Sequence, residues 1–248
     1  MLHIIYRASD SEKPDVRPKY YSKLLCLKSL LSALKKVNGY TLTLYYDGQG
    51  GQELTEELSK NAAHCKVVRI LLKSNTGSFW YVYQESLKLP DNDWIYFVED
   101  DYIHLDTAIE KLLECIRLIT QADYITLYDH PVRYATDYHL GLDIPHRINK
   151  IYISESHHWR TQESTCMTFA AKVATLKEDR PIFEKYVKNV AVPEDRELFK
   201  RLQGLVGYEN NSLFRLLVGP MPSLSTHCRL PWLAPLVDWK GVVRKIKL

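Results

Sequence analysis

The sequence contains no apolar run close to the roughly 20 residues that a membrane-spanning helix needs, so we expect no membrane span. Its first residues, MLHIIYRASD, have too short an apolar stretch for a signal peptide, and we therefore expect a cytoplasmic protein. The charge is also nearly balanced, because 33 basic and 30 acidic residues leave a net charge of +3. A nucleic-acid-binding protein usually carries a strong basic excess, so we expect no nucleic-acid partner.

Cysteine pairs and glycine-rich nucleotide motifs are absent as well. The five cysteines are scattered and never form C-x-x-C, which indicates buried, reduced thiols and not a zinc site or a redox couple. His157 and His158 are adjacent, and adjacent side chains of a strand point apart, which disfavours zinc there. No G-x-x-x-x-G-K-S/T or G-x-G-x-x-G occurs, so a P-loop or a Rossmann dinucleotide site lacks its main support.

The first half of the chain alternates between strand-like and helix-like patterns. This alternation, in a chain with 46% hydrophobic residues, predicts an α/β fold with a mostly parallel central sheet flanked by helices. Strands are predicted over 2–6, 40–48, 65–72 and 93–98. Helices are predicted over 20–39, 52–62, 77–89 and 104–121.

The second half has weaker periodicity. We expect a long loop over 128–163 with one strand at 150–154, strands at 164–171 and 212–219, helices at 179–190 and 193–205, and a proline-rich loop over 220–239. The end, WKGVVRKIKL, alternates basic and apolar residues; it suits an anionic surface, but a frayed terminus is the favoured interpretation. With no linker visible, we expect one domain over 1–248. It would have a first half over about 1–104, a second over about 105–239, and a basic tail over 240–248.

Three consecutive acidic residues, Glu99, Asp100 and Asp101, follow the fourth predicted strand in DWIYFVEDDYIH. If the extended backbone continues, Glu99 and Asp101 lie on one side and Asp100 on the other. Two carboxylates at the rim of a cleft suit a hard divalent cation that is completed by water and substrate phosphates. An acidic turn that caps a helix starting near Leu105 is the alternative, since carboxylates favour helix N-termini.

Polar side chains follow several other strands too. In an open α/β sheet, ligands bind beyond the carboxyl ends of the strands, and these residues share that edge. They are Tyr6 and Arg7, then Asp47, then Asn75, Gly77 and Ser78.

Together, the order of these strands, Asp47, the segment SNTGS and the segment VEDD resemble GT-A fold glycosyltransferases of the family 2 type, over about residues 2–227. The resemblance implies a Rossmann-like nucleotide-sugar-binding half and an acceptor half. It implies that Tyr6, Arg7 and Asp47 lie near the nucleotide base and that Asn75, Gly77 and Ser78 approach the nucleotide or ribose. It further implies that Glu99 and Asp100 serve the ribose and metal shell, and that Asp101 ligates the metal. Glu99 stands where the family usually has aspartate, so the roles within the triplet stay open.

Asp195, in VPEDRELFKRL, matches the general base of inverting GT-A enzymes, with Glu194 as the second candidate. The same two carboxylates would stabilise a helix N-terminus after Pro193 without any catalytic role. Both interpretations stay open.

His227 matches the C-terminal histidine that GT-A proteins often bring to the metal or the diphosphate. An imidazole ligand favours Mn²⁺ over Mg²⁺ as the cofactor. Ser225, Thr226 and Arg229 would add donors to phosphate oxygens.

The resemblance implies transfer of a sugar from a UDP, GDP or dTDP sugar to an acceptor hydroxyl, on a glycan or another molecule, and we expect the transfer to be of the inverting kind. Aromatic, His and Arg residues over 127–139 and 156–165 suit sugar binding, or simply pack on the sheet. A nucleotidyltransferase acting on sugar phosphates would share the sheet and the acidic site, but the loop after its first strand is usually rich in Gly, Arg and Lys. A non-catalytic carbohydrate-binding protein on the same fold is the third hypothesis.

Overall fold

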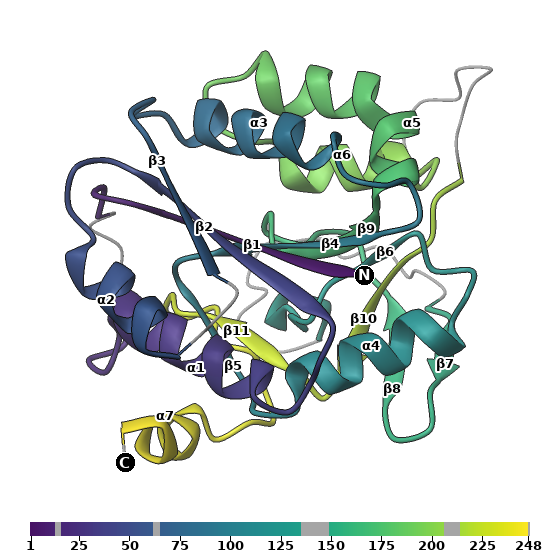
Figure 1. The fold of residues 1–248 in the computed structure, drawn as a ribbon. Coiled ribbons are helices and arrows are strands. Elements are labelled where there is room, and N and C mark those ends of the chain that lie inside the picture. The colour runs from purple at the N-terminus through teal and green to yellow at the C-terminus, as the bar shows by residue number, and fades with distance from the viewer. Residues whose placement is uncertain (13–15, 62–64, 135–148, 206–213, 248) are drawn as a thin grey trace.

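A nine-stranded sheet with the order β3-β2-β1-β4-β9-β6-β10-β8-β7 forms the centre of the molecule (Figure 1). The computed structural model describes residues 1–12, 16–61, 65–134, 149–205 and 214–247. The strands are β1 (Leu2–Ser9), β2 (Tyr40–Asp47), β3 (Cys65–Ile70), β4 (Trp94–Glu99), β6 (Tyr124–Ile125), β7 (Ile151–Ile153), β8 (His158–Thr161), β9 (Phe169–Lys172) and β10 (Leu217–Met221). Within this sheet only β8 and β9 run against the other strands, so the predicted mostly parallel sheet is confirmed.

Helices cover both faces of the sheet. The helices are α1 (Lys23–Leu34), α2 (Gln52–Asn61), α3 (Asn75–Ser86), α4 (Ala108–Leu118), α5 (Val173–Phe183), α6 (Asp195–Leu202) and α7 (Trp239–Lys247). Helices α3, α5 and α6 lie on one face, and α1, α2, α4 and α7 lie on the other (Figure 1).

Strand β1 shows why this sheet needs two layers of helices. Its side chains alternate between two hydrophobic cores: Ile4 and Tyr6 pack in the core of α1 and α4, and Ile5 packs in the core of α3 and α5. A strand buried on both faces reads as a nearly continuous apolar run, and LHIIY is apolar apart from the buried His3. The α/β fold expected from the first half of the sequence is therefore confirmed.

The largest correction in the first half concerns the residues after the acidic triplet. The helix expected over 104–121 begins only at Ala108, and Tyr102–His104 form a strand, β5. This strand pairs antiparallel with β11 (Ser225–His227), inside the stretch expected to be an irregular loop. The cause is a backbone ladder between distant segments, which local periodicity does not reveal.

Several boundaries in the second half also differ from the prediction. The helix expected over 179–190 is α5, which starts earlier, at Val173, and continues into a π-turn over Glu184–Lys188. Of the strand expected over 164–171, only its end is extended, as β9. The loop expected over 128–163 contains β8 as well as β7, and its residues 135–148 lie outside the described part of the chain.

Residues Trp239–Lys247 form helix α7 and are not frayed. Helix α7 packs on α1 through Trp239 and Val243, both buried in the core, and Trp239 Nε1 donates to the Ala234 carbonyl oxygen at 2.8 Å. These two apolar residues of the expected basic tail thus contribute to folding.

Two further expectations are tested directly. Among the described residues, no helix is both long and apolar enough to cross a membrane. All five cysteines are free; Cys26, Cys115 and Cys228 are buried, and Cys65 and Cys166 are partly buried.

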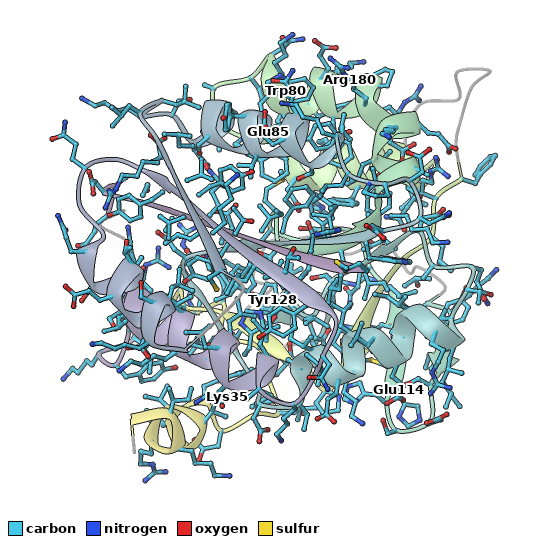
Figure 2. All side chains as sticks on the ribbon, in the orientation of Figure 1. Lys35, Trp80, Glu85, Glu114, Tyr128 and Arg180 are labelled. Carbon is cyan, nitrogen blue, oxygen red and sulfur yellow. The ribbon has the colours of Figure 1, made fainter. Side chains whose placement is uncertain are left out.

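Glu114 of α4, labelled in Figure 2, attaches the β7–β8 hairpin to this helix. Its carboxylate accepts hydrogen bonds from the backbone N–H and the hydroxyl of Ser156, at 2.8 and 2.6 Å, and Lys111 lies 3.2 Å away. Burial opposes ionisation of Glu114, but hydrogen bonds from Ser154, Ser156 and Lys111 outweigh it and lower the pKa to about 2. The ionised carboxylate therefore stabilises the fold.

We expect Glu114→Gln to lower the free energy of unfolding by about 1 kcal/mol at pH 7, the usual value of such a hydrogen bond. Because the folded pKa is depressed, this stabilisation is complete above the ordinary glutamate pKa and is lost as the pH falls toward about 2. Urea unfolding at several pH values checks this, with Glu110→Gln as the control on the exposed face of α4. A difference from wild type that did not shrink at low pH would contradict it.

Candidate active site

A cavity of about 800 Å³ opens at the carboxyl ends of β1, β2 and β4. This is the size of a small-molecule site and the location expected for ligands of an α/β sheet. Of the described residues that line it, seven are acidic and four are basic. The charged ones are Asp10, Glu12, Asp47, Glu53, Glu99, Asp100 and Asp101, with Arg7, Arg17, Lys23 and Lys73. Any anionic ligand of this cavity would therefore meet an excess of negative side chains.

Each carboxylate of the triplet has a cationic partner from another part of the chain. Glu99 Oε1 accepts from Arg7 Nη2 at 2.5 Å. Asp100 Oδ2 lies 3.1 Å from Lys23 Nζ and accepts from the backbone N–H of Ser9 at 3.3 Å. This pairing shows how the chain tolerates three adjacent carboxylates.

Asp101 has two partners on the same oxygen. Its Oδ2 accepts from Arg17 Nη1 at 3.0 Å and lies 2.9 Å from His227 Nε2. Burial opposes ionisation of Asp101, but His227 and Arg17 outweigh it and hold the pKa of this carboxyl well below its ordinary value. Asp101 is thus ionised at neutral pH.

The helix-capping interpretation of the triplet is wrong. Helix α4 begins at Ala108 with Thr107 as its N-cap, so the triplet lies more than one turn before it. The alternation argument fails as well, because β4 ends at Glu99 and Asp100 and Asp101 lie in a turn. All three side chains line the cavity.

Asp100 has the opposite electrostatic balance to Asp101. Burial, together with the charges of Asp101 and Glu99, outweighs Lys23 and raises the pKa of Asp100 to about 6. Neighbouring carboxylates whose pKa values are driven apart are typical of functional sites, although structural ion pairs produce them too.

The β5–β11 ladder brings His227 to Asp101. In this ladder His227 pairs with Tyr102, and the Cys228 N–H donates to the Asp101 carbonyl oxygen at 2.8 Å. The rings of His227 and Tyr102 stack in parallel, with centroids 5.3 Å apart. His227 is not among the described residues that line the cavity, so it approaches Asp101 from outside it.

The family resemblance implies a divalent cation, and the residues fit one with two protein ligands. Asp101 and His227 present an oxygen and an imidazole nitrogen 2.9 Å apart, which suits neighbouring positions around one ion. Among the described residues, no group of three or more His, Cys, Asp or Glu side chains is placed to hold a metal. Water and substrate phosphates complete many such sites, so two protein ligands are sufficient. Arg17 occupies the same oxygen, however.

Arg7 holds the triplet to the start of α3. Its Nη1 donates to the Asn75 carbonyl oxygen at 3.0 Å and to Ser78 Oγ at 2.6 Å, and its Nη2 donates to Asn75 Oδ1 at 2.8 Å. With Glu99 as well, the buried guanidinium has four acceptors from the chain. Arg7 therefore positions Asn75, Ser78 and Glu99, all of which line the cavity.

Asp47 has a similar positioning role. Its Oδ1 accepts from the backbone N–H groups of Leu72 and Lys73 at 2.8 and 2.9 Å, which fixes the turn that leads into α3. Gly77 and Tyr6 are not among the described lining residues: the Gly77 N–H caps the helix on Ser74 Oγ, and Tyr6 is fully buried. Of the residues predicted to bind nucleotide, these two do not reach the cavity.

Asp195, the first residue of α6, holds a turn over 164–167 by four hydrogen bonds. Its Oδ1 accepts from Thr165 Oγ1 at 2.6 Å and from the Met167 N–H at 2.9 Å. Its Oδ2 accepts from the Thr165 N–H at 2.9 Å and from Ser164 Oγ. The turn is unusual because Cys166 and Met167 both have positive φ, at 48° and 59°. Glu194 is exposed and caps nothing with its side chain.

Cys166 lies in the turn that Asp195 holds. Burial and the charges of Asp195 and Asp101 raise the pKa of this thiol to about 12. Asp195 is not among the described cavity-lining residues.

Of the described aromatic, His and Arg residues over 127–139 and 156–165, some make buried structural contacts and others lie near the surface. Arg160 forms a buried ion pair with Asp129 at 2.6 Å, and His157 Nε2 donates to the Pro222 carbonyl oxygen at 2.8 Å. The rings of His130 and the partly exposed Trp232 lie in contact at a tilt of 38°, with centroids 5.3 Å apart, next to Tyr128 at the centre of Figure 2. Of the phosphate donors expected near His227, Ser225 and Thr226 are buried in β11.

Sequence reasoning missed Arg17 and Lys23, although both line the cavity. The signal available was a group of basic residues shortly after the first strand, in VRPKYYSK. Their partners lie about 80 residues away in the chain, so the pairing was not visible.

Comparison with known proteins gives matches in structure only. No protein-family model and no curated protein sequence matches the chain. S. aureus TarS matches with a TM-score of 0.43 and 14% identity, over 72% of this chain and 29% of TarS. The galactosyltransferase LgtC, solved with donor and acceptor sugar analogs, matches with a TM-score of 0.48 and 9% identity, over 99% of this chain and 94% of LgtC.

A 4-diphosphocytidyl-2C-methyl-D-erythritol synthase from Anaerococcus prevotii also matches, with a TM-score of 0.48 and 11% identity over 99% of this chain and 94% of that one. At 9–14% identity these matches concern the fold alone, and the residues of the site must distinguish between the activities.

We expect Asp195→Asn to lower the free energy of unfolding by about 1–3 kcal/mol, because the new NH₂ group faces a donor and leaves it unsatisfied. Ser164→Ala removes one hydrogen bond and keeps the carboxylate, so its expected loss is about 1 kcal/mol. Urea unfolding measures both. Equal stability of Asp195→Asn and wild type would mean that the four bonds do not hold the turn.

Proposed function

We propose that the protein is a glycosyltransferase that moves a sugar from a nucleoside-diphosphate sugar to an acceptor hydroxyl with inversion. The observation that carries this proposal is the cavity at the strand ends, bordered by an acidic triplet whose last member, Asp101, faces His227. The cavity has room for a nucleotide sugar, and UDP, GDP and dTDP are the donor types we would test.

A donor diphosphate needs positive charge in this site. The excess of acidic side chains would repel it, and a divalent cation held by Asp101 and His227 would neutralise the leaving diphosphate. Mn²⁺ suits the mixed oxygen and nitrogen ligands better than Mg²⁺. Asn75, Ser78 and Glu99, held by Arg7, would contact the nucleoside.

Asp195 is our candidate general base, with Glu194 as the alternative. Its place outside the described lining of the donor cavity suits a group that takes a proton from the acceptor hydroxyl on the face opposite the leaving group. The chain already fills its four hydrogen-bonding positions, so the acceptor hydroxyl would displace the Ser164 hydroxyl from Oδ2. The tilted ring pair of His130 and Trp232 would offer an aromatic surface to an acceptor sugar.

A nucleotidyltransferase remains the second candidate. Arg17 and Lys23 follow β1 and line the cavity, which is where such an enzyme needs cations for a triphosphate. Release of pyrophosphate from a nucleoside triphosphate and a sugar phosphate, with no turnover of nucleotide sugars, would favour it.

We expect UDP, GDP or dTDP to raise the melting temperature only when Mn²⁺ is present. A ligand at about 100 times its Kd stabilises the folded state by roughly 2.7 kcal/mol. Asp101→Asn should abolish the shift, whereas Asp106→Asn, an exposed carboxylate at the start of α4, should keep it. A shift that survives EDTA in both variants would argue against a cation on Asp101.

We expect Asp195→Asn to lower turnover of the active nucleotide sugar by at least about 100-fold, the usual contribution of a general base. Ser164→Ala, which loosens the same turn but keeps the base, should lose far less. The anomeric configuration of the product, read by NMR, tests inversion. Equal losses in the two variants would point to a structural role for Asp195 and leave Glu194 as the candidate.

A further inference from the structure

Arg17 is fixed beside the candidate metal ligand by three contacts. Its Nη1 donates to Asp101 Oδ2 at 3.0 Å and to the Cys228 carbonyl oxygen at 2.8 Å, and its guanidinium lies 4.7 Å from the centre of the Tyr21 ring. Its side chain is only 16% exposed. Contacts of this number and burial distinguish it from an ordinary surface ion pair.

A guanidinium and a divalent cation cannot both bind Asp101 Oδ2 favourably. Arg17 stays charged at any ordinary pH, so a cation on the same oxygen would meet a positive charge within a few ångströms. His227 is different, because its neutral form offers a lone pair to a metal. Arg17 thus opposes the cation that Asp101 and His227 are arranged to receive.

Arg17 is also placed to meet the donor. It lines the cavity, and Lys23 lies at the same edge against Asp100. A guanidinium matches phosphate oxygens with its planar set of N–H donors. The two cations supplied by the chain therefore lie where a diphosphate next to Asp101 would need positive charge.

We propose that Arg17 is a built-in counter-cation of Asp101 that competes with the divalent cation and itself binds the donor diphosphate. This inference rests on the proposed function, and it adds a role for a residue outside the acidic triplet. Without metal, Arg17 keeps Asp101 paired. When a cation occupies Asp101, the guanidinium is released toward the phosphates.

The test measures binding of Mn²⁺ alone by EPR, and binding of the active nucleoside diphosphate at saturating Mn²⁺ by calorimetry. We expect Arg17→Ala to bind Mn²⁺ about fivefold or more tightly than wild type, the lower end of usual coupling between two sites. At saturating Mn²⁺ the same variant should bind the nucleoside diphosphate about tenfold more weakly, because a charge-assisted bond to the diphosphate is lost. Opposite shifts in the two affinities are the signature of competition.

Lys19→Ala is the matched control, since it removes one exposed positive charge two residues away, outside the described cavity lining. Arg17→Gln keeps a polar side chain and part of the apolar stem without the charge, and it replaces Arg17→Ala if that variant unfolds. Unchanged or weaker Mn²⁺ binding in the Arg17 variant, while wild type still binds nucleotide with Mn²⁺, would overturn this inference alone. Absence of nucleotide binding by wild type under every condition would instead overturn the proposed function.

Discussion

Repulsion among three consecutive carboxylates is the constraint around which this site is built. Glu99, Asp100 and Asp101 leave β4 side by side, and the chain brings a separate cation to each: Arg7 from β1, Lys23 from the start of α1, and Arg17 from the segment between them. All three cations come from the chain around β1, the strand that pairs with β4 in parallel register, Arg7 opposite Glu99. The register of the β1–β4 pair thus places Arg7 beside Glu99, where it neutralises one of the charges at this edge of the sheet.

The pKa values of Asp100 and Asp101 shift in opposite directions because their surroundings differ. Burial and two neighbouring acids outweigh one ammonium group at Asp100 and raise its pKa, whereas an imidazole and a guanidinium outweigh burial at Asp101 and lower its pKa. Strand alternation does not explain the division, because the strand has ended. The three carboxylates differ because their cationic partners approach from different parts of the chain.

Those parts of the site that depend on local pattern could be predicted from the sequence. Buried strands were visible as apolar runs, and parallel strands bring their carboxyl ends to one edge, so Asp47, Asn75, Ser78 and the triplet were correctly expected together. Tyr6 was expected there too, but strand alternation turns its side chain into the core under α1. Gly77 lies in the first turn of α3, where its N–H donates to Oγ of the N-cap Ser74, and it is outside the described cavity lining.

The remaining parts depend on contacts between distant segments. Asp101 and His227 are 126 residues apart, and they meet because a three-residue strand after the triplet pairs with one near the end of the chain. Neither strand is long enough to show a period of two. Arg17 had no local signal beyond its charge, because an irregular segment carries it and contacts with residues such as Asp101, Cys228 and Tyr21 define its place.

The proposed transfer would draw its donor and acceptor sides from different parts of the chain. Asp101 lines the cavity, whereas Asp195 is outside the described lining and holds the turn over 164–167. An inverting transfer needs its base on the face opposite the leaving group, and a base outside the donor cavity suits that requirement. The β5–β11 pairing presents His227 to Asp101, so the cation site would depend on backbone pairing between distant segments, and the acidic triplet would supply the charge.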